Sequence, residues 1–418
     1  MADDRPCRCV EGTPLNQTLP LFSSAERRPI LDELAAFNEF GAATIVDERD
    51  GVTYFINEFW TPRQRQAHRL HEISYRACFK PQLPRFFIER LTEPGDVVYD
   101  PFMGRGTTPL EAAFLGRTPY GNDTNPLSRA FVEARINPPT LEQVARRLDQ
   151  IPWETFDTFT EDDLLAFYHP TTLAKLEGLR AWIFEREKAG TLDKIDFWIR
   201  MVAINRLTGH SAGFFSVYTL PPNQAVTVER QRGINTKRGQ VPPERDVKSI
   251  ILKKSRNLLS DGGPSVETSL FLTRQSDDTP EIPDDAVTLT VTSPPFLDIV
   301  NYEADNWLRC WFLGVDPKSV RITTHRSVEG WTHFIARTLA ELARITKTGG
   351  HIAFEVGEVR KGTVRLEENV IEAAKRLPLQ ALGVMINAQQ FTKTSNCWGV
   401  SNNVGGTNSN RIVIFKRV

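Results

Sequence analysis

Two short segments, about 190 residues apart, contain residue types that could carry out chemistry together. The first is DPFMGRGTT at 100–108, a glycine loop directly after the apolar run 96–99. Glycines at such a point let the backbone approach a nucleotide-like ligand closely. The second is TSPPF at 292–296, a polar-Pro-Pro-aromatic loop that also follows an apolar run. Such a loop could hold a planar ring that bears an exocyclic amine.

The glycine loop has carboxylates at positions suited to a cofactor. Gly104 and Gly106 can adopt positive φ. Asp100 could accept a hydrogen bond from the amino group of a cofactor, or order the loop. Asp123, about 20 residues later, is where a dinucleotide-type fold places its ribose-binding acid. Asp277 precedes the next strand and could receive an adenine amine. The alternative is a strand-turn-helix whose glycines serve only the turn. No phosphate-binding lysine follows, which argues against a P-loop.

The second loop suits activation of an aromatic amine, whose lone pair is delocalised into the ring. The Ser293 hydroxyl and the Pro294 carbonyl could accept hydrogen bonds from the amine and free that lone pair. Pro294 and Pro295 stiffen the loop, and Phe296 would stack on the ring. The nitrogen could then act directly as a nucleophile, with no metal and no covalent intermediate. The alternative is a rigid turn after a strand.

In their strand contexts, the two motifs resemble the S-adenosylmethionine-dependent amino-methyltransferases of DNA. The form Asp-Pro-Phe-x-Gly-x-Gly-Thr-Thr is similar to the cofactor loop of that family. Segment 71–81 resembles the family segment that folds over the methionine end of the cofactor, although Phe79 within it could equally be core packing. The resemblance implies S-adenosyl-L-methionine as cofactor and a base flipped out of double-stranded DNA. The implied cofactor-binding residues are Phe79, Asp100, Pro101, Phe102, Gly104, Gly106, Thr107, Thr108, Asp123 and Asp277.

The resemblance also bears on the target base. Serine at position 293 is the form commonest in enzymes that modify cytosine N4, whereas aspartate there is typical of adenine N6. The implied catalytic residues are Ser293, Pro294, Pro295 and Phe296. Adenine N6, an RNA methyltransferase and a non-catalytic nucleic-acid-binding protein remain alternatives. The resemblance leaves open whether a cognate restriction nuclease acts separately on the same sites.

Hydrophobic periodicity predicts an α/β fold, a Rossmann-like class I methyltransferase sheet whose C-terminal antiparallel hairpin forms one edge. The expected strands are 96–99, 118–123, 287–291 and 351–356, with a hairpin of 383–391 and 411–416. The expected helices are 81–91, 109–115, 173–184, 197–204 and 331–345.

The chain divides into an N-terminal extension (1–60), a catalytic domain (61–139 and 266–418) and an inserted target-recognition region (140–265). The insert is expected to be helical to about 205 and irregular over 208–247. Within 229–256, nine Lys or Arg stand against three Asp or Glu, which suits contact with phosphates, although a solvated charged face is the simpler alternative. The predicted DNA-binding residues are Arg230, Arg232, Lys237, Arg238, Lys253, Lys254 and Arg256.

Bulk composition adds limits. The chain of 418 residues is 40% hydrophobic and 25% charged, as ordinary globular proteins are, and its net charge of −1 requires any nucleic-acid surface to be local. Its five scattered cysteines lack paired zinc-ligand spacing and favour a reducing, cytoplasmic setting with no metal. The sequence contains no apolar run of about 18 residues, so no membrane span is expected.

Overall fold

The computed structural model describes residues 29–60, 68–75, 78–220, 225–295, 302–320, 325, 327–357, 364–388 and 409–418. Phe296, predicted to stack on the target ring, lies outside these residues.

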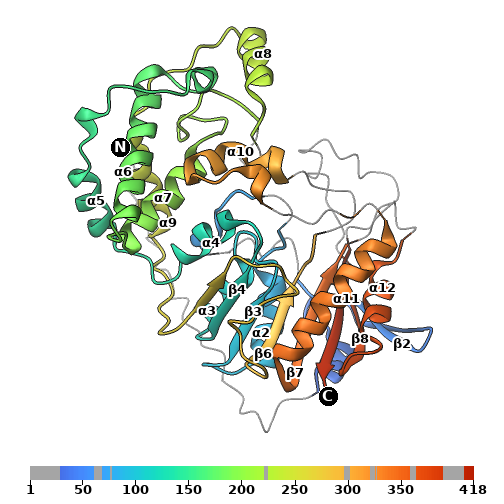
Figure 1. The fold of residues 1–418 in the computed structure, drawn as a ribbon. Coiled ribbons are helices and arrows are strands. Elements are labelled where there is room, and N and C mark those ends of the chain that lie inside the picture. The colour runs from blue at the N-terminus through green and yellow to red at the C-terminus, as the bar shows by residue number, and fades with distance from the viewer. Residues whose placement is uncertain are drawn as a thin grey trace, which may run out of the picture.

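A nine-stranded sheet forms the lower half of the molecule in the view of Figure 1. From one edge to the other, its strands are β5 (Leu270–Leu272), β4 (Thr118–Asn122), β3 (Val97–Asp100), β6 (Val287–Thr292), β7 (Thr346–Val356), β9 (Ser409–Arg417), β8 (Leu379–Ala388), β2 (Val52–Asn57) and β1 (Ile45–Arg49). The five strands from β5 to β7 run parallel, and β9 is antiparallel to both of its neighbours. The predicted Rossmann-like methyltransferase sheet with its C-terminal hairpin is therefore confirmed.

The position predicted for that hairpin is wrong in one respect. Strand β9 lies between β7 and β8, and β8 pairs in parallel with β2, so the hairpin is interior to the sheet. The edge is formed instead by the hairpin of β1 and β2. Residues 45–57 are thus part of the same sheet, not a separate N-terminal extension. Strand β1 carries little signal in the sequence, because it is short and none of its five residues is buried.

Helices cover both faces of the sheet. On one face lie α1 (Ile30–Ala36), α2 (Gln82–Leu91) and α3 (Thr107–Phe114), and on the other lie α11 (Val328–Ile345) and α12 (Leu366–Ala374). Successive strand residues point to opposite faces, so Val98 packs with α2 while Tyr99 packs with α11. The apolar face predicted for α11 is confirmed, since Trp331, Phe334, Ile335, Leu339, Leu342 and Ile345 are all buried.

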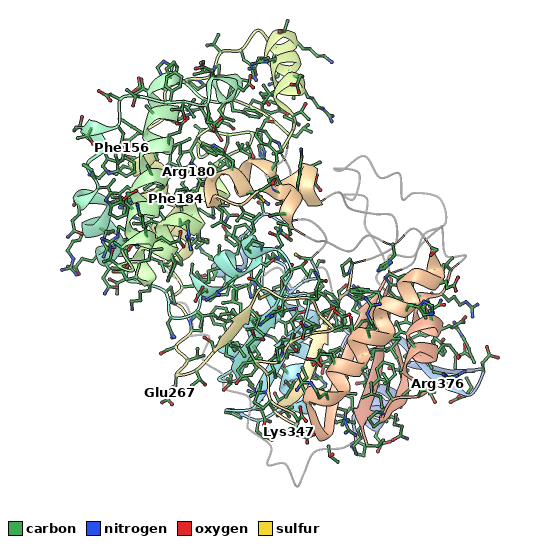
Figure 2. The ribbon with its side chains drawn as sticks, viewed as in Figure 1. Phe156, Arg180, Phe184, Glu267, Lys347 and Arg376 are labelled. Carbon is green, nitrogen blue, oxygen red and sulfur yellow. The ribbon has the colours of Figure 1, made fainter. Side chains whose placement is uncertain are left out.

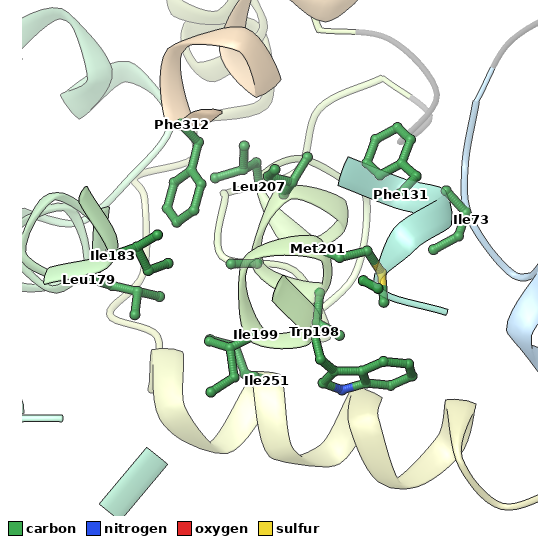
Figure 3. Packing of buried hydrophobic residues seen from close by; sticks show 14 of the residues in the cluster. Ile73, Phe131, Leu179, Ile183, Trp198, Ile199, Met201, Leu207, Ile251 and Phe312 are labelled. Carbon is green, nitrogen blue, oxygen red and sulfur yellow. The ribbon is translucent and has the colours of Figure 1, made fainter. Parts of the chain in front are cut away.

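A second layer of helices, here called the helical region, lies beyond the β5 side of the sheet (Figure 1). It comprises α4 (Pro126–Glu133), α5 (Leu141–Gln150), α6 (Pro170–Lys188), α7 (Lys194–Arg206), α8 (Val228–Arg238), α9 (Val247–Leu258) and α10 (Tyr302–Leu313), with short 3-10 turns at Trp153–Thr155 and Asp162–Ala166. Its core surrounds the fully buried Trp198 and Met201 of α7 (Figure 3).

Two findings revise the predicted insert. Residues 208–247 are not wholly irregular, because they contain α8, which Thr227 caps through its side chain. Helix α10 follows the second motif in sequence but places Phe312 in the core of the helical region, against Ile183 and Leu179 of α6 (Figure 3). The helical region therefore receives a helix from the part of the chain assigned to the catalytic domain.

Within the described parts of the chain, no helix has both the length and the apolar composition needed to cross a membrane.

Candidate active site

The two motifs meet at the carboxyl ends of neighbouring strands. Strands β3 and β6 are adjacent and parallel, and they carry the glycine loop and the Ser-Pro-Pro loop at the same edge of the sheet. Thr292 Oγ1 donates to Asp100 Oδ1 at 2.6 Å, and Thr108 Oγ1 donates to the Val291 carbonyl at 3.0 Å. Segments that are far apart in sequence are thus joined by direct hydrogen bonds, at the place where open α/β sheets bind ligands.

The glycine loop depends on its glycines and on Asp123. Gly104 has φ +48°, and its N–H donates to Asp123 Oδ2 at 2.9 Å. The other carboxylate oxygen of Asp123 accepts the N–H of Asn125 at 2.9 Å. Gly106, with φ +79°, begins α3, and a side chain there would collide with Val132. The carboxylate predicted to bind ribose therefore also fixes the loop.

Asp100 is almost wholly buried beneath the loop. Burial raises the pKa of its carboxyl to about 7, although hydrogen bonds from Thr292, the Phe102 N–H and Thr108 act in the opposite direction. A carboxyl at this pKa changes charge near neutrality, and a cation placed beside it would favour the ionised form.

The remaining loop residues support one another. The Pro101 carbonyl accepts from Asn122 Nδ2 at 3.4 Å, and Thr107 Oγ1 accepts from Arg105 Nε at 3.3 Å. Phe102 lies on the α11 side, with its ring 5.8 Å from that of Phe334. Their contacts with a cofactor stay predictions.

A strap of chain before α2, defined as the described residues of 68–79, lies over this loop. A Cβ placed on Gly104 would be 3.5 Å from Cys78 Sγ and 3.6 Å from Tyr75 Cε1. Phe79 is half-buried, and its carbonyl accepts from Arg105 Nη2 at 3.2 Å. The sequence analysis named Phe79 but missed Tyr75 and Cys78, which no residue pattern distinguishes from ordinary core residues.

Asp277 is not joined to the glycine loop by any contact among the described residues. Its Oδ2 accepts from Arg337 Nε of α11 at 2.6 Å, and its side chain is mostly covered. A role toward adenine would fall to its other carboxylate oxygen and stays a prediction.

The Ser-Pro-Pro loop is held by side-chain contacts that the sequence did not indicate. The Ser293 hydroxyl donates to Glu355, a buried carboxyl at the end of β7, which also accepts from Asn410 Nδ2 at 2.8 Å. Burial raises the pKa of Glu355. Trp331 Nε1 donates to the Pro295 carbonyl at 2.9 Å. The only signal in the sequence was an acidic residue at the end of a predicted apolar strand.

The predicted basic stretch divides between two helices at different ends of the helical region (Figure 1). Helix α8 carries Arg230, Arg232, Lys237 and Arg238, and α9 carries Lys253, Lys254 and Arg256. Three of these charges have partners: Arg232 pairs with Asp163 at 2.6 Å, Lys254 pairs with Glu72 at 2.8 Å, and the Arg238 guanidinium lies 3.9 Å from the centre of the Tyr218 ring. The seven residues therefore do not form one continuous patch.

Comparison with known proteins agrees with this geometry. Residues 39–129 match the family model described as "DNA methylase" (N6_N4_Mtase). The chain is 25% identical to the type II methyltransferase M.BsoBI of Geobacillus stearothermophilus, over 75% of this chain and 65% of that protein. It is 29% identical to the type II methyltransferase M.MvaI of Kocuria varians, over 37% of this chain and 30% of that protein.

The chain is therefore similar to the N4/N6 DNA methyltransferases, and the match to the family model lies within residues 39–129. The chain spans less than two thirds of the length of these relatives. The family match covers β1 to α4, including the edge hairpin, the strap and the glycine loop. Among solved structures, the chain resembles TrmN from Thermus thermophilus, to which it is 12% identical in sequence. The superposition covers 84% of this chain and 52% of that chain, and its TM-score is 0.32.

S-adenosylmethionine is the cofactor of this family, and the residues present fit it. A buried carboxyl, Asp100, lies beneath a glycine loop in which Gly104 and Gly106 both have positive φ. A second carboxylate, Asp123, ends the neighbouring strand. An aromatic side chain, Tyr75, covers the loop from the strap.

Proposed function

We propose that the chain transfers a methyl group from S-adenosylmethionine to an exocyclic amine of a flipped-out base in double-stranded DNA, with cytosine N4 as the preferred target. The observation that carries the proposal is the junction of the two loops. Hydrogen bonds from Thr292 to Asp100 and from Thr108 to Val291 set the Ser-Pro-Pro loop beside the glycine loop. A methyl donor on one loop and an amine on the other would be held within reach.

The cofactor would supply an electrophilic methyl group on a sulfonium, and its sulfur would leave with the bonding electron pair. The glycine loop, Asp123 and the strap would bind and orient it. The Ser293 hydroxyl donates to Glu355, so its oxygen lone pairs would be free to accept from the target amine. The Pro294 carbonyl would be the second acceptor. After the N–CH3 bond forms, the surplus proton of the amine would pass through Ser293 Oγ to Glu355, whose raised pKa favours receiving it.

Serine at position 293 supports cytosine N4, and adenine N6 is the second candidate, because the same acceptor pair would serve either amine. The test uses tritium-labelled S-adenosylmethionine and unmethylated genomic DNA, which is digested to nucleosides and analysed by mass spectrometry. N4-methylcytosine would support the proposal in full. N6-methyladenine would overturn the choice of base, and label in RNA but not in DNA would overturn the substrate. No product, together with cofactor binding, would favour a non-catalytic binder.

Titration of Asp100 predicts a pH dependence of cofactor binding. The cofactor's α-ammonium stays protonated below about pH 7.5, whereas Asp100, with a pKa near 7, is largely protonated at pH 6. Binding at pH 6 is therefore expected to expel a proton from Asp100, and affinity is expected to rise between pH 6 and pH 7. Calorimetry at pH 6 in two buffers of different ionisation enthalpy would measure that proton.

The Asp100→Asn variant is the control, since it should release no proton and bind weakly at both pH values. The contribution of Asp100 to folding stability changes with pH in the opposite direction to its contribution to cofactor affinity. A pKa raised on folding stabilises the protein below the unfolded value of 3.8, and this contribution is lost as pH rises through about 7. Proton release that persists in the variant would show that another group titrates.

Helix α8 is the part of the predicted basic stretch that we propose for DNA contact, within a target-recognition region made by the helices of 140–265 and α10. Its Arg230 and Lys237 side chains are exposed. Replacing both by glutamine is expected to weaken DNA binding about tenfold and to reduce the slope of log K against log salt by about two. Fluorescence anisotropy across a salt series would measure both quantities.

Lys253 and Arg256 of α9 are the matched pair, also exposed but on the other helix. Replacing them by glutamine should leave the salt slope unchanged if α8 is the contact. A reduced salt slope in the α9 variant, with an unchanged slope in the α8 variant, would assign the DNA contact to α9 instead.

A further inference from the structure

The strap is connected to the cofactor loop by more than contact. The Tyr75 hydroxyl accepts from Asn125 Nδ2 at 3.2 Å, and the Asn125 N–H donates to Asp123. Asp123 in turn accepts from Gly104. A continuous series of hydrogen bonds therefore runs from the strap to the carboxylate beside the glycine loop.

Two arginines secure the strap to the loop through main-chain carbonyls. Arg105, within the loop, donates to the carbonyls of Ile73 at 3.4 Å and Phe79 at 3.2 Å. Arg135, which follows α4, is fully buried and donates to the carbonyl of Leu70 at 2.7 Å. Burial lowers the pKa of Arg135 to about 9. A buried guanidinium has five donors and no acceptor, so such carbonyls are the partners that make its burial tolerable.

A third arginine reaches the strap from the helical region. Arg309 of α10 is only 6% exposed, and its Nη2 donates to the Ser74 carbonyl at 2.7 Å. Its Nη1 donates to Asn306 Oδ1, one helical turn earlier, at 3.0 Å. The guanidinium also lies 5.9 Å from the centre of the Phe131 ring of α4. Helix α10 packs on α4, α6 and α7, so Arg309 is fixed by the helical region and not by the sheet.

Helix α10 is thus linked to three parts of the proposed active site. It follows the Ser-Pro-Pro loop in sequence, it contributes Leu308 and Phe312 to the core of the helical region, and it holds the strap through Arg309. A shift of α10 would therefore remove one of the contacts that hold the strap over the glycine loop.

We propose that Arg309 is a positioning residue for the methyl donor: from α10 it fixes the strap over the glycine loop, so that the cofactor pocket is completed by the helical region. The identity of the ligand in this proposal rests on the proposed function. The position of the strap does not. Cofactor retention would consequently respond to the same helices that are proposed to contact DNA.

The first test compares Arg309→Met with Arg309→Lys. The Met variant is expected to bind S-adenosylmethionine about tenfold more weakly by calorimetry, chiefly through faster dissociation in stopped flow. The Lys variant should recover part of this loss, because its ammonium can donate to Ser74 but cannot also bridge to Asn306. In steady state, KM for the cofactor should rise while kcat at saturating cofactor stays within about twofold. A fall in kcat with unchanged KM would overturn the proposal.

Arg180→Lys is the matched control. Arg180 lies on α6 beside Phe184 (Figure 2) and donates through Nε to the Trp311 carbonyl of α10 at 2.8 Å. It therefore supports the same helix without touching the strap. Its variant should leave the cofactor affinity unchanged, and a loss equal to that of Arg309→Met would assign the effect to α10 as a whole.

The second test needs no cofactor. Cys78 lies in the strap against Gly104, and Cys310 is buried on α10 beside Arg309. Alkylation followed by peptide mass spectrometry should show faster modification of Cys78 in Arg309→Met, with Cys310 unchanged. If both thiols react faster in Arg309→Met, α10 has unfolded in that variant. The alkylation rate of Cys78 is then compared between Arg309→Lys, which keeps the charge, and the unmodified protein.

An unchanged rate at Cys78 would overturn the role of Arg309. A faster rate at Cys78 in a protein that binds no S-adenosylmethionine would retain that role and reject the proposed function. The two failures are therefore distinguishable.

Discussion

Replacing Ser293 by alanine is expected to lower kcat by about 100- to 1,000-fold, the range seen when one preorganised polar group is removed from a reacting centre. The hydroxyl is set by its bond to Glu355, and its loss removes both an acceptor for the target amine and the route by which the proton leaves. The affinity for S-adenosylmethionine should stay within about twofold, because Ser293 lies on the other loop. Single-turnover kinetics and calorimetry on the same preparation would measure the two quantities.

Ser276→Ala is a suitable control for this variant. Ser276 is buried on the α11 side of the sheet, and, like Ser293, its hydroxyl forms a side-chain hydrogen bond, here with Thr338 at 2.8 Å. The Ser276→Ala variant should be less stable, but the rate of its chemical step should be unchanged. Undiminished turnover in Ser293→Ala would remove the amine-acceptor role and leave the loop as a rigid turn.

Replacing Asp123 by alanine is expected to weaken cofactor binding by about 100-fold, or about 2.7 kcal/mol. Two losses combine. The variant would lack the carboxylate proposed to accept the ribose hydroxyls, and it would release the N–H groups of Gly104 and Asn125. Hydrogen bonds to a charged acceptor contribute about 1.5–3 kcal/mol each, so a loss of this size is reasonable. Calorimetric titration would measure it.

Asp96→Asn is the matched control, since Asp96 precedes the first residue of β3, at the end of the strand opposite to the loop. It accepts from Thr288 Oγ1 at 2.9 Å and from the N–H of Glu93 at 2.8 Å. That variant should lose stability and keep cofactor affinity. Unchanged affinity in Asp123→Ala would refute the ribose assignment.

The strand-loop-helix unit could be predicted because local signals agreed there. A short strand-like run, a glycine loop and a segment of helical periodicity follow one another over 96–115. The observed bounds of β3 and α3 lie within two residues of the predicted ones. Helix α11 was equally readable, since its apolar residues recur at helical spacing over five turns.

The parts of the site that the sequence did not indicate depend on tertiary contacts. Glu355 and Asn410 are polar residues on buried strands. The pairing of β6 with β7 brings Glu355 to Ser293, and the pairing of β7 with β9 brings Asn410 to Glu355. The strap arginines donate to main-chain carbonyls, which carry no residue pattern. The basic stretch looked continuous in sequence, but the turn between α8 and α9 sends its halves apart.

The edge hairpin also affects how the chain folds as it is made. Strand β2 has no partner inside the sheet until β8 exists, and the N–H of Phe59 bonds to the side chain of Asn387, 328 residues later. During synthesis, Tyr54 and Phe55 must remain without their β8 partners, Val384 and Met385, while nearly the whole chain is translated. Such non-local pairing is slow and leaves an unpaired strand open to other chains. The order of translation therefore makes closing of this edge a late folding event, after the glycine loop and the helical region can already have formed.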